Sequence, residues 1–334
     1  MIVSYECDAR RTAVAVDIGG TKIACGLVDL DAEKMPQVHD VKKIPTEADL
    51  GGAHVLELVI QSIKDALVRA EERGEKPVGV GISSAGVVDP RSGNITFAND
   101  LMPGWGGTSL GTVVTESCGL PCAVLNDVHA HALGEARHGG GKELPSVLVV
   151  AVGTGIGGAF VNHGIIMLGA HDEAGHIGHV AALAAAGVAC SCGATGHLEP
   201  VAAGPGIIRE YLRLGGIDSC DDGSPVDGAE IDFRANNGDV RAQAAEELSG
   251  RALGEVLGSM CNMLDPAAII LSGSVAECGP YWQNALHAAF ESQAMPPVKS
   301  TPIIKGVLGG RAPLIGAVEN LFDPAYLETR NTCH

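Results

Sequence analysis

The feature that most constrains this fold is a strand–glycine turn–strand unit that occurs twice. The first unit has an apolar strand at 13–17, a turn through Gly19 and Gly20, and a second strand at 22–29. The second unit repeats this order with a strand at 146–152 followed by the turn at 153–158. Two such units predict a duplicated α/β architecture, in which two similar lobes face each other across a cleft.

Hydrophobic periodicity places the remaining elements. The segment 53–72 is predicted to be an amphipathic helix with Leu56, Ile60, Ile63, Leu67 and Ala70 on its apolar face. A long helix at 241–264 has Leu248, Ala252, Val256, Met260 and Leu264 on its apolar face. Further predicted elements are strands at 78–83, 122–125 and 267–273, helices from 126 to 137 and 314–322, a loop-rich insert at 165–200 and a polar surface excursion at 215–240.

The charge and composition exclude some classes of partner. The formal net charge is −18, which argues against nucleic acid or an anionic membrane as the main partner. A small anion stays possible, because backbone N–H groups can hold a phosphate on an acidic protein. The 46 glycines favour tight turns, and the 3% of aromatic residues would leave ligand recognition to polar contacts rather than to stacking on rings.

The ten cysteines are scattered, with one close pair at Cys190 and Cys192. The opening residues lack the pattern of a secretory signal, and no apolar run reaches the ~18 residues of a membrane span. We therefore expect a reduced, cytoplasmic setting, in which the close pair is available for a metal.

Both glycine turns fit phosphate binding. Between Asp17 and Thr21 the glycines allow close backbone approach, Thr21 offers a hydroxyl, and Asp17 could hold the water shell of Mg²⁺. An ordinary glycine hairpin is the alternative. The turn Gly153–Gly158 contains G-x-G-x-x-G, but a strand rather than a helix is predicted to follow, which argues against a dinucleotide-binding fold.

Two further segments carry chemistry. Asp127, at a strand end, is placed to take a proton from a substrate hydroxyl, although a helix N-cap is the favoured interpretation of Asn126-Asp127 taken alone. The segment 173–199 contains His176, His179, Cys190, Cys192, His197 and Glu199. Two cysteines and two histidines at this spacing predict a closed, structural Zn²⁺ site, and unrelated buried thiols and surface histidines are the alternative.

Together these segments resemble the ROK family of sugar kinases, within the actin-like ATPase and sugar kinase superfamily. The resemblance extends from about Ala13 to Leu321 and implies an α/β fold of two actin-like (ribonuclease H-like) lobes around a central cleft. The matching motifs are DIGGTK (17–22), Gly86 in SSAGVVD, Asn126-Asp127, GTGIGG (153–158), AGHIGH (174–179), CSCGATGHLE (190–199) and LSGS (271–274).

The resemblance implies a role for each matched residue. Asp127 would be the general base, and the sugar would contact Gly86, Asn99, Asn126, Asp127, His176, His179 and Glu199. The residues that would bind ATP and Mg²⁺ are Asp17, Gly19, Gly20, Thr21, Lys22, Gly153, Thr154, Gly155 and Gly273. The zinc ligands would be His179, Cys190, Cys192 and His197.

Two positions depart from the family pattern. His176 stands where family glucokinases have a sugar-binding Glu, as it does in bacterial N-acetylmannosamine kinases. An ionised Glu only accepts hydrogen bonds, whereas His can donate one to an acetamido carbonyl. His197 stands where the zinc motif has a third Cys, and His is also a competent Zn²⁺ ligand.

We therefore expect an ATP-dependent kinase that acts on the 6-hydroxyl of N-acetylmannosamine, with glucose as the second choice of substrate. The first lobe is expected at 1–126 plus 312–334 and the second at 127–311, and the protein is expected to form a homodimer. A DNA-binding repressor of the same family is disfavoured by the charge and by the 16 residues before Asp17. A non-catalytic sugar sensor is the rival from another class, and polyphosphate is an alternative phosphoryl donor.

Overall fold

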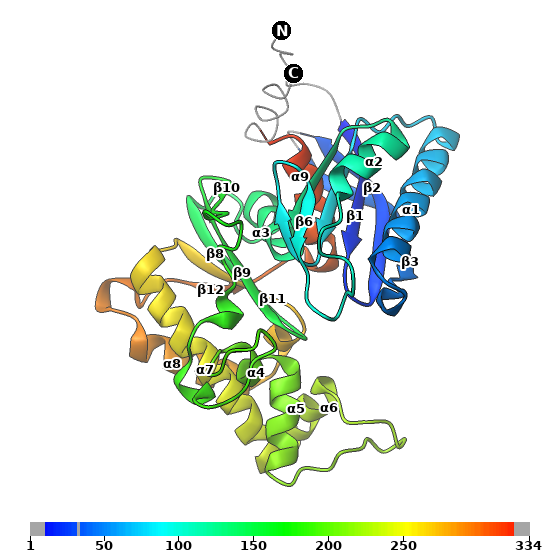
Figure 1. Ribbon diagram of the computed structural model, residues 1–334. Coiled ribbons are helices and arrows are strands. Elements are labelled where there is room, and N and C mark those ends of the chain that lie inside the picture. Colours follow the sequence, from blue (N-terminus) through cyan, green and yellow to red (C-terminus); the bar gives the residue numbers. More distant parts are fainter. Residues whose placement is uncertain (1–10, 32–33, 324–334) are drawn as a thin grey trace. The chain divides into compact units, whose positions relative to one another are not determined.

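The computed structural model describes residues 11–31 and 34–323 (Figure 1). Contacts divide them into two compact units. Unit 1 contains the residues up to Glu143, Gly164–Ala174 and the residues from Val307, and unit 2 contains Leu144–His163 and Gly175–Gly306.

The lobe boundaries expected at 126/127 and 311/312 stay a prediction. Parts of the expected first lobe, residues 1–10 and 324–334, lie outside the described residues.

Unit 1 is built on a five-stranded sheet with the order β3-β2-β1-β4-β7. β1 (Arg11–Ile18) and β2 (Lys22–Asp31) form the first antiparallel hairpin, and β3 (Lys34–Pro45) pairs antiparallel with β2. β4 (Val80–Ser84) pairs parallel with β1, and β7 (Cys122–Asn126) pairs parallel with β4. The carboxyl ends of β1, β4 and β7 therefore lie at one edge of the sheet.

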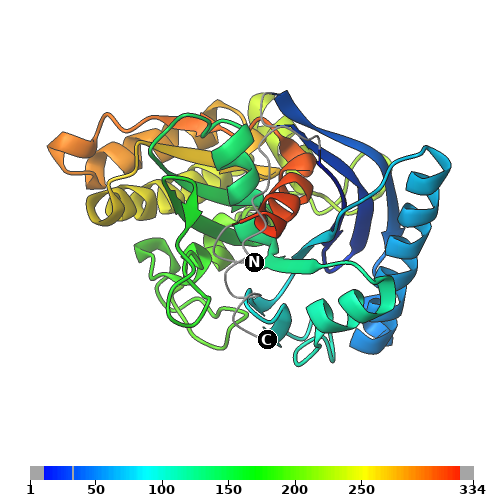
Figure 2. The ribbon, with the colours of Figure 1, turned by 90° about the horizontal axis from the view of Figure 1, so that it is seen from above.

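Helices cover both faces of this sheet, as Figure 2 shows for α1 (Gly52–Glu72) on one side and α9 (Ala312–Leu321) on the other. Alternate side chains of β1 enter two different clusters, because successive strand residues point to opposite faces. Val14, Val16 and Ile18 pack in the cluster that includes α1, whereas Ala13 and Ala15 pack with α9. α2 (Leu110–Cys118) lies with α1, and α3 (Asp127–His138) packs on α9.

The expected apolar face of α1 is only partly right. Ile63 and Ala70 are fully buried, but the other fully buried positions are Val55, Val59 and Ala66. Leu56 and Leu67 are only partly buried at the edge of the same cluster. Two neighbouring stripes of α1 are apolar, and packing on the sheet selects the one with the smaller, β-branched side chains.

Unit 2 repeats the plan of unit 1. β8 (Ser146–Val152) and β9 (Ile156–Asn162) form an antiparallel hairpin, and β11 (Ala268–Ser272) and β12 (Ile303–Lys305) continue the sheet in parallel. Within unit 2 the order of this sheet is β9-β8-β11-β12. The two-residue strand β10 (Ile165–Ile166) belongs to a segment of unit 1. The expected duplicated α/β architecture is confirmed, and so is the absence of a helix directly after the GTGIGG turn.

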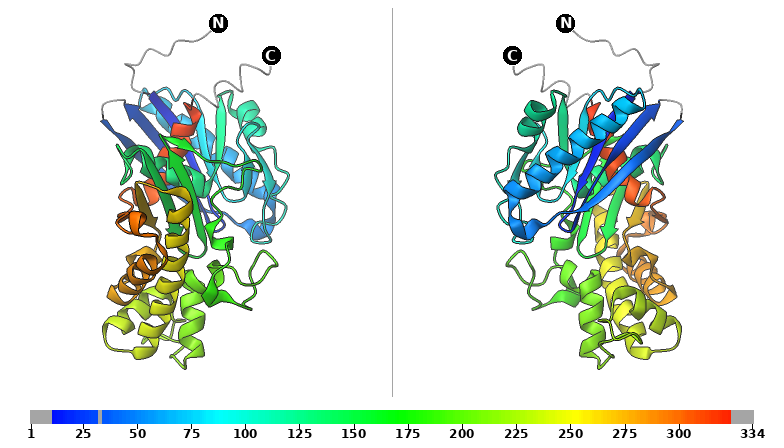
Figure 3. Two further views of the ribbon diagram at one scale, coloured as in Figure 1. Left: turned by 90° about the vertical axis from the view of Figure 1, so that its left-hand side faces the viewer. Right: turned by 90° about the vertical axis from the view of Figure 1, so that its right-hand side faces the viewer.

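Two long helices pack side by side in unit 2, α7 (Val240–Leu264) and α8 (Pro280–Gln293) (Figure 3). Gly250, Gly254 and Gly258 form a stripe on α7, and a Cβ at any of them would overlap the α8 backbone. The apolar face predicted for α7 did not include these three glycines. It also did not include Leu253 and Leu257, which are buried. Glycines carry no hydrophobic signal, yet here they allow the α8 backbone to approach α7 closely.

The interpretation of 215–240 as a surface excursion is right in that most of its residues are exposed or half-buried, but it missed a helix. This segment contains the helix α6 (Gly228–Asn236), which begins where the Asp227 carboxylate accepts a hydrogen bond from the Glu230 N–H at 2.8 Å. α6 buries Ile231 and Ala235 and is otherwise largely polar, which explains why the sequence pattern missed it.

The remaining elements are short. They are β5 (Val87–Asp89), β6 (Asn94–Phe97), α4 (Glu199–Ala202), α5 (Gly204–Arg213) and 3₁₀ turns at Ala48–Leu50, Ile177–His179, Leu183–Ala185, Val275–Glu277, Pro296–Val298 and Gly309–Arg311. Among the described residues, no helix combines the length and apolar character that a membrane crossing requires.

Stability should depend on the close approach of α3 and α9. A Cβ at Gly316 of α9 would overlap the Ala130 carbonyl oxygen of α3. We expect Gly316→Ala to lower the free energy of unfolding by about 1–3 kcal/mol or more, because the helices must move apart. Denaturant unfolding measures this.

The matched control is Gly310→Ala, because a Cβ at Gly310 meets nothing within 4 Å. That change should be neutral or stabilise by up to about 1 kcal/mol. Equal unfolding free energies for the two variants would contradict the observed helix contact.

Candidate functional site

In unit 1, polar side chains gather where β1, β4 and β7 end. The strand register places Asp17 beside Ser83 and Ser84 beside Asn126. The Ser83 hydroxyl donates to the Asp17 carboxylate at 2.7 Å. Burial raises the pKa of Asp17, and this hydrogen bond and the charge of Lys22 oppose the rise. The parallel register thus brings a carboxylate from the first glycine turn to the same edge as Asn126 and Asp127.

Asp127 is the first residue of α3. Its carboxylate accepts hydrogen bonds from the Val128 N–H at 2.9 Å and from the side-chain amide of Asn126 at 3.0 Å. Burial raises the pKa of Asp127 to about 6, and the nearby charge of Asp17 adds to the rise against these hydrogen bonds. A carboxyl group with this pKa is largely ionised at neutral pH and can still accept a proton.

Asn126 is the N-cap of α3, as the alternative interpretation of this pair expected. Its side-chain oxygen accepts from the N–H groups of Val128 at 3.0 Å and His129 at 3.3 Å. Its amide nitrogen also donates to the Gly86 carbonyl at 2.9 Å. The cap therefore holds Asp127 in place on one side and the loop after β4 on the other.

The loop at Gly86 depends on glycine. Gly86 has φ +97°, and a Cβ there would lie 2.7 Å from the Phe97 carbonyl oxygen. The buried Trp105 donates its indole N–H to the Ser84 hydroxyl at 3.2 Å, next to this loop. Asn99 is exposed, and its side-chain oxygen accepts from the Leu101 N–H at 3.1 Å.

The first glycine turn is held by backbone contacts and open at its tip. The Gly19 N–H donates to the Lys22 carbonyl at 3.0 Å, and the Thr46 hydroxyl donates to the Gly19 carbonyl at 2.6 Å. Gly20, Thr21 and Lys22 are exposed. The turn can therefore present its tip to a ligand while its base stays fixed.

In unit 2, the second glycine turn packs against a carboxylate. The Gly153 N–H donates to the Gly155 carbonyl at 2.9 Å, and Thr154 and Gly155 are exposed. Glu199 accepts a hydrogen bond from the Ile156 N–H at 2.9 Å through one oxygen and from the Ser191 hydroxyl at 3.3 Å through the other. A Cβ at Gly155 would lie 2.7 Å from a carboxylate oxygen of Glu199, so a side chain at this position would displace that carboxylate.

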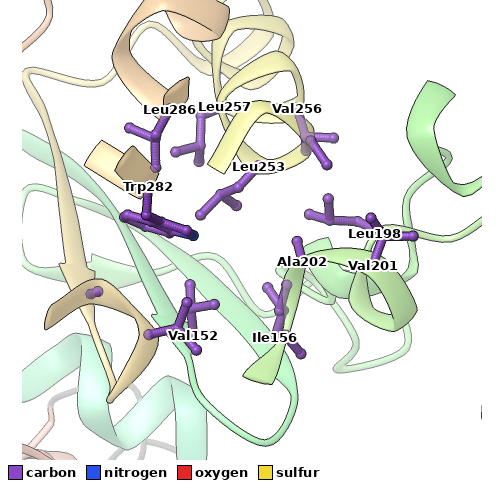
Figure 4. Close-up of a cluster of buried hydrophobic side chains, with 14 of the residues drawn as sticks. Val152, Ile156, Leu198, Val201, Ala202, Leu253, Val256, Leu257, Trp282 and Leu286 are labelled. Atoms are coloured by element: carbon purple, nitrogen blue, oxygen red, sulfur yellow. The ribbon is translucent and has the colours of Figure 1, made fainter. Parts of the chain in front are cut away.

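The buried core of unit 2 supports the helix that begins at Glu199. Figure 4 shows Trp282 of α8 and Leu253 of α7 in one cluster with Ala202 of α4. The Trp282 indole N–H donates to the Ser249 hydroxyl at 3.0 Å, and that hydroxyl donates to the Ala202 carbonyl at 2.9 Å. A rigid core thus fixes the backbone that carries Glu199.

Gly273 and the start of α5 lie beside the same turn. Gly273 has φ +91°, and a Cβ there would overlap the Val152 carbonyl. The Gly204 N–H, at the start of α5, donates to the Gly153 carbonyl at 2.8 Å. The residues expected to serve phosphates in unit 2 are therefore brought together at the end of β8.

The four expected zinc ligands also converge. The ligand atoms of His179, Cys190, Cys192 and His197 all lie within 4.8 Å of one another. Nδ1 of His179 lies 3.5 Å from Sγ of Cys190, and Nδ1 of His197 lies 3.2 Å from Sγ of Cys192. The ring of His176 stacks on that of His179 with a centroid distance of 6.2 Å. The set has the composition and closeness of a tetrahedral Zn²⁺ site.

The sequence interpretation missed Ser83, Ser191 and Trp105, which hold Asp17, Glu199 and the loop after β4. Their hydroxyl and indole groups have no motif of their own. Knowledge of the parallel register would have identified Ser83, because it is the position opposite Asp17.

Comparisons with known proteins agree with this geometry. The model of the ROK family matches residues 13–322. A glucokinase from Halalkalibacterium halodurans is 30% identical over 318 residues, which cover 92% of this chain and 93% of that protein. An N-acetylmannosamine kinase from Escherichia coli is 29% identical over 266 residues, which cover 79% of this chain and 83% of that protein.

A solved structure shows the same fold. The ROK family glucokinase from Streptomyces griseus, in complex with glucose and AMPPNP, has a TM-score of 0.75 at 28% identity. The alignment covers 92% of this chain and 98% of that one. The expected actin-like fold is therefore confirmed.

The Asn126 cap should contribute measurably to stability. We expect Asn126→Ala to lower the free energy of unfolding by about 1 kcal/mol, because two N–H groups of α3 lose their acceptor. Denaturant unfolding is the measurement.

Ser109→Ala provides the control, because Ser109 is the N-cap residue of α2 and makes no side-chain cap hydrogen bond. It should change stability by no more than a few tenths of a kcal/mol. If Ser109→Ala lowered the free energy of unfolding as much as Asn126→Ala does, the cap hydrogen bonds at α3 would not be the cause of the loss.

Proposed function

This chain belongs to the ROK family, and we propose that it is an ATP-dependent sugar kinase that phosphorylates the 6-hydroxyl of N-acetylmannosamine. The observation that carries the kinase assignment is Asp127, a carboxylate held at the start of α3 with a pKa of about 6. A protein that only senses sugar has no need for a base at this position.

In the proposed reaction, Asp127 takes the proton of the sugar hydroxyl as that oxygen attacks phosphorus. The hydrogen bonds from Asn126 and Val128 hold one oxygen of the Asp127 carboxylate. The other oxygen is available to the substrate. Phosphoryl transfer depends on alignment and on neutralising charge more than on covalent chemistry, so this orientation is the main contribution of α3.

ATP with Mg²⁺ supplies the phosphoryl group and neutralises its charge. In unit 1 the residues that would serve these ligands are Asp17, Gly19, Gly20, Thr21 and Lys22. The exposed tip of that turn and the carboxylate of Asp17 fit this role.

In unit 2 the corresponding residues would be Gly153, Thr154, Gly155 and Gly273. Positive φ at Gly273 and the close approach of Gly155 to Glu199 support a turn lined largely by backbone. Backbone N–H groups without side chains in the way are suited to phosphate oxygens.

The sugar would be held by Gly86, Asn99, Asn126, His176, His179 and Glu199. Glu199 is fixed by Ile156 and Ser191, so its carboxylate can accept from sugar hydroxyls without moving. His176 supports the choice of N-acetylmannosamine, because an imidazole can donate to an acetamido carbonyl. Glucose is the alternative substrate, and the 30% identity with a glucokinase supports it.

We also propose that His179, Cys190, Cys192 and His197 bind a structural Zn²⁺. A metal at this position would tie the segment that carries His176 to the segment that leads into Glu199. The homodimer expected from the family resemblance is a proposal that light scattering would test.

Activity on a panel of sugars tests the function. ADP release with ATP and Mg²⁺ should be strongest with N-acetylmannosamine among that sugar, N-acetylglucosamine, glucose, mannose and fructose. Asp127→Asn should reduce kcat by at least ~100-fold, because the general base is lost. Sugar binding without turnover on any of these sugars would instead make the protein a sensor.

His176→Glu tests the choice of sugar separately. This variant should shift preference from N-acetylmannosamine toward glucose, because the donor is replaced by an acceptor. Unchanged preference would refute the role of His176 while leaving the kinase assignment intact.

The pH dependence follows from the pKa of Asp127. The base works when ionised, so kcat/KM should be constant above a pH of about 6 and fall about tenfold for each pH unit below it. A value of kcat/KM that is unchanged between pH 7 and pH 5 would exclude Asp127 as the base.

Zinc content tests the metal proposal. Cys192→Ser should remove one zinc ion per chain, measured by mass spectrometry of the purified protein, because a thiolate ligand is lost. Cys220→Ser is the control, since Cys220 is a partly exposed thiol outside the cluster. No zinc at this site in the parent protein would refute the ligand set.

A further inference from the structure

A second group of possible metal ligands lies in unit 2, away from the residues discussed so far. Asp232 belongs to α6, Glu246 to α7, and Cys278 follows the turn Val275–Glu277 after β11. One donor atom from each residue lies within 4.8 Å of the other two. Atoms that bind one zinc ion lie about 2.0–2.3 Å from it, so they are separated from one another by distances within this limit.

No backbone N–H group of the described residues donates a hydrogen bond to the Glu246 carboxylate. Glu246 is 1% exposed, and the polar side chains that interact with it are those of Asp232 and Cys278. No ion pair within residues 11–31 and 34–323 includes it. An unpaired buried charge costs several kcal/mol, so this group requires a positive partner or a proton.

Glu135 shows how the same chain satisfies another buried glutamate. Glu135 is 0% exposed, and its carboxylate accepts hydrogen bonds from the N–H groups of Gly140 at 3.0 Å, Val307 at 3.1 Å and Leu308 at 2.8 Å. Glu246 lies at equal depth with none of these donors and faces a second carboxylate instead. The two glutamates therefore differ in what completes their surroundings.

The two neighbours of Glu246 are fixed in position. The Gly279 N–H donates to one oxygen of Asp232 at 2.7 Å, which leaves the other oxygen free to bind. Gln283 donates to the carbonyls of Ala276 at 3.0 Å and Cys278 at 3.3 Å, which holds the backbone on both sides of Glu277. Carboxylate ligands of metals are commonly oriented by such outer hydrogen bonds.

We propose that Asp232, Glu246 and Cys278 bind a divalent cation of the zinc type. Two carboxylates and a thiol suit Zn²⁺, which accepts both oxygen and sulfur, whereas Mg²⁺ and Ca²⁺ take oxygen ligands. A proton shared between Asp232 and Glu246 would also relieve the repulsion of the carboxylates. In that arrangement Cys278 would remain a neutral thiol that donates to Glu246, whereas a cation would use all three donor atoms of the group.

The acid–base properties of the group are consistent with a site completed by a cation. Without one, burial and the charge of Asp232 raise the pKa of Glu246 to about 8. Burial and both carboxylates raise the pKa of Cys278 to about 12. Metal binding would release the protons of the thiol and of Glu246 to solvent, as ligands must be deprotonated.

This ion would link α6, α7 and the segment after β11. Gly273 lies in that segment, immediately after β11 and before Cys278. The metal would thus stabilise the fold of unit 2 beside a residue proposed to serve the nucleotide. The site does not depend on the kinase proposal, because its occupancy is measured without catalysis.

Zinc content measured by mass spectrometry of the full-length protein tests the site. Glu246→Gln and Cys278→Ser should each contain one zinc ion per chain fewer than the parent, whereas Cys220→Ser should equal the parent. Cys220, like Cys278, is a partly exposed thiol in unit 2, but it is outside the cluster. Equal zinc content in the parent and the Cys278→Ser variant would overturn the proposal and leave a shared proton as the explanation.

Cobalt(II) provides a second readout that does not depend on the removal of Glu246. In a chain with Cys190→Ser and Cys192→Ser, added Co²⁺ should give thiolate charge-transfer absorption that disappears with the further change Cys278→Ser. Circular dichroism verifies that each variant is folded. Absorption that persists without Cys278, or that is missing when Cys278 is present, would contradict the assignment.

Discussion

The parallel pairing of β1, β4 and β7 is the constraint on which the candidate site of unit 1 depends. Parallel strands end at the same edge of a sheet, so residues distant in the sequence meet there. Asp17 reaches Ser83 in this way, and Asn126 reaches the loop at Gly86. Unit 2 uses the same order of a hairpin followed by parallel strands, and there Gly153 and Gly273 meet at one end.

Glycine determines how closely the elements around these edges approach. The stripe of Gly250, Gly254 and Gly258 brings α7 against α8, and Gly316 brings α9 against α3. Well-packed interiors leave no room for an added methyl group without movement of a neighbour. The high glycine content therefore reflects helix contacts as well as turns.

Carboxylates in this protein have three different surroundings. Glu135 is buried and fully hydrogen-bonded, which is a structural role. Asp127 is held by two hydrogen bonds and keeps a raised pKa, which suits proton transfer. Glu246 is buried beside Asp232 without a backbone N–H donor, which suits a cation. Surroundings, and not residue type, separate these roles.

The sequence by itself determined the repeated strand–turn–strand units, most element positions, the Asn126-Asp127 pair and the convergence of two Cys and two His. These follow from local periodicity and spacing, which one stretch of chain contains. Tertiary structure alone decided which stripe of α1 faces the sheet, how α6 begins at Asp227, and that Ser83 and Ser191 hold the proposed functional carboxylates. It also decided that Asp232, Glu246 and Cys278 meet, because their contact depends on the packing of three elements and leaves no periodic signal in the chain.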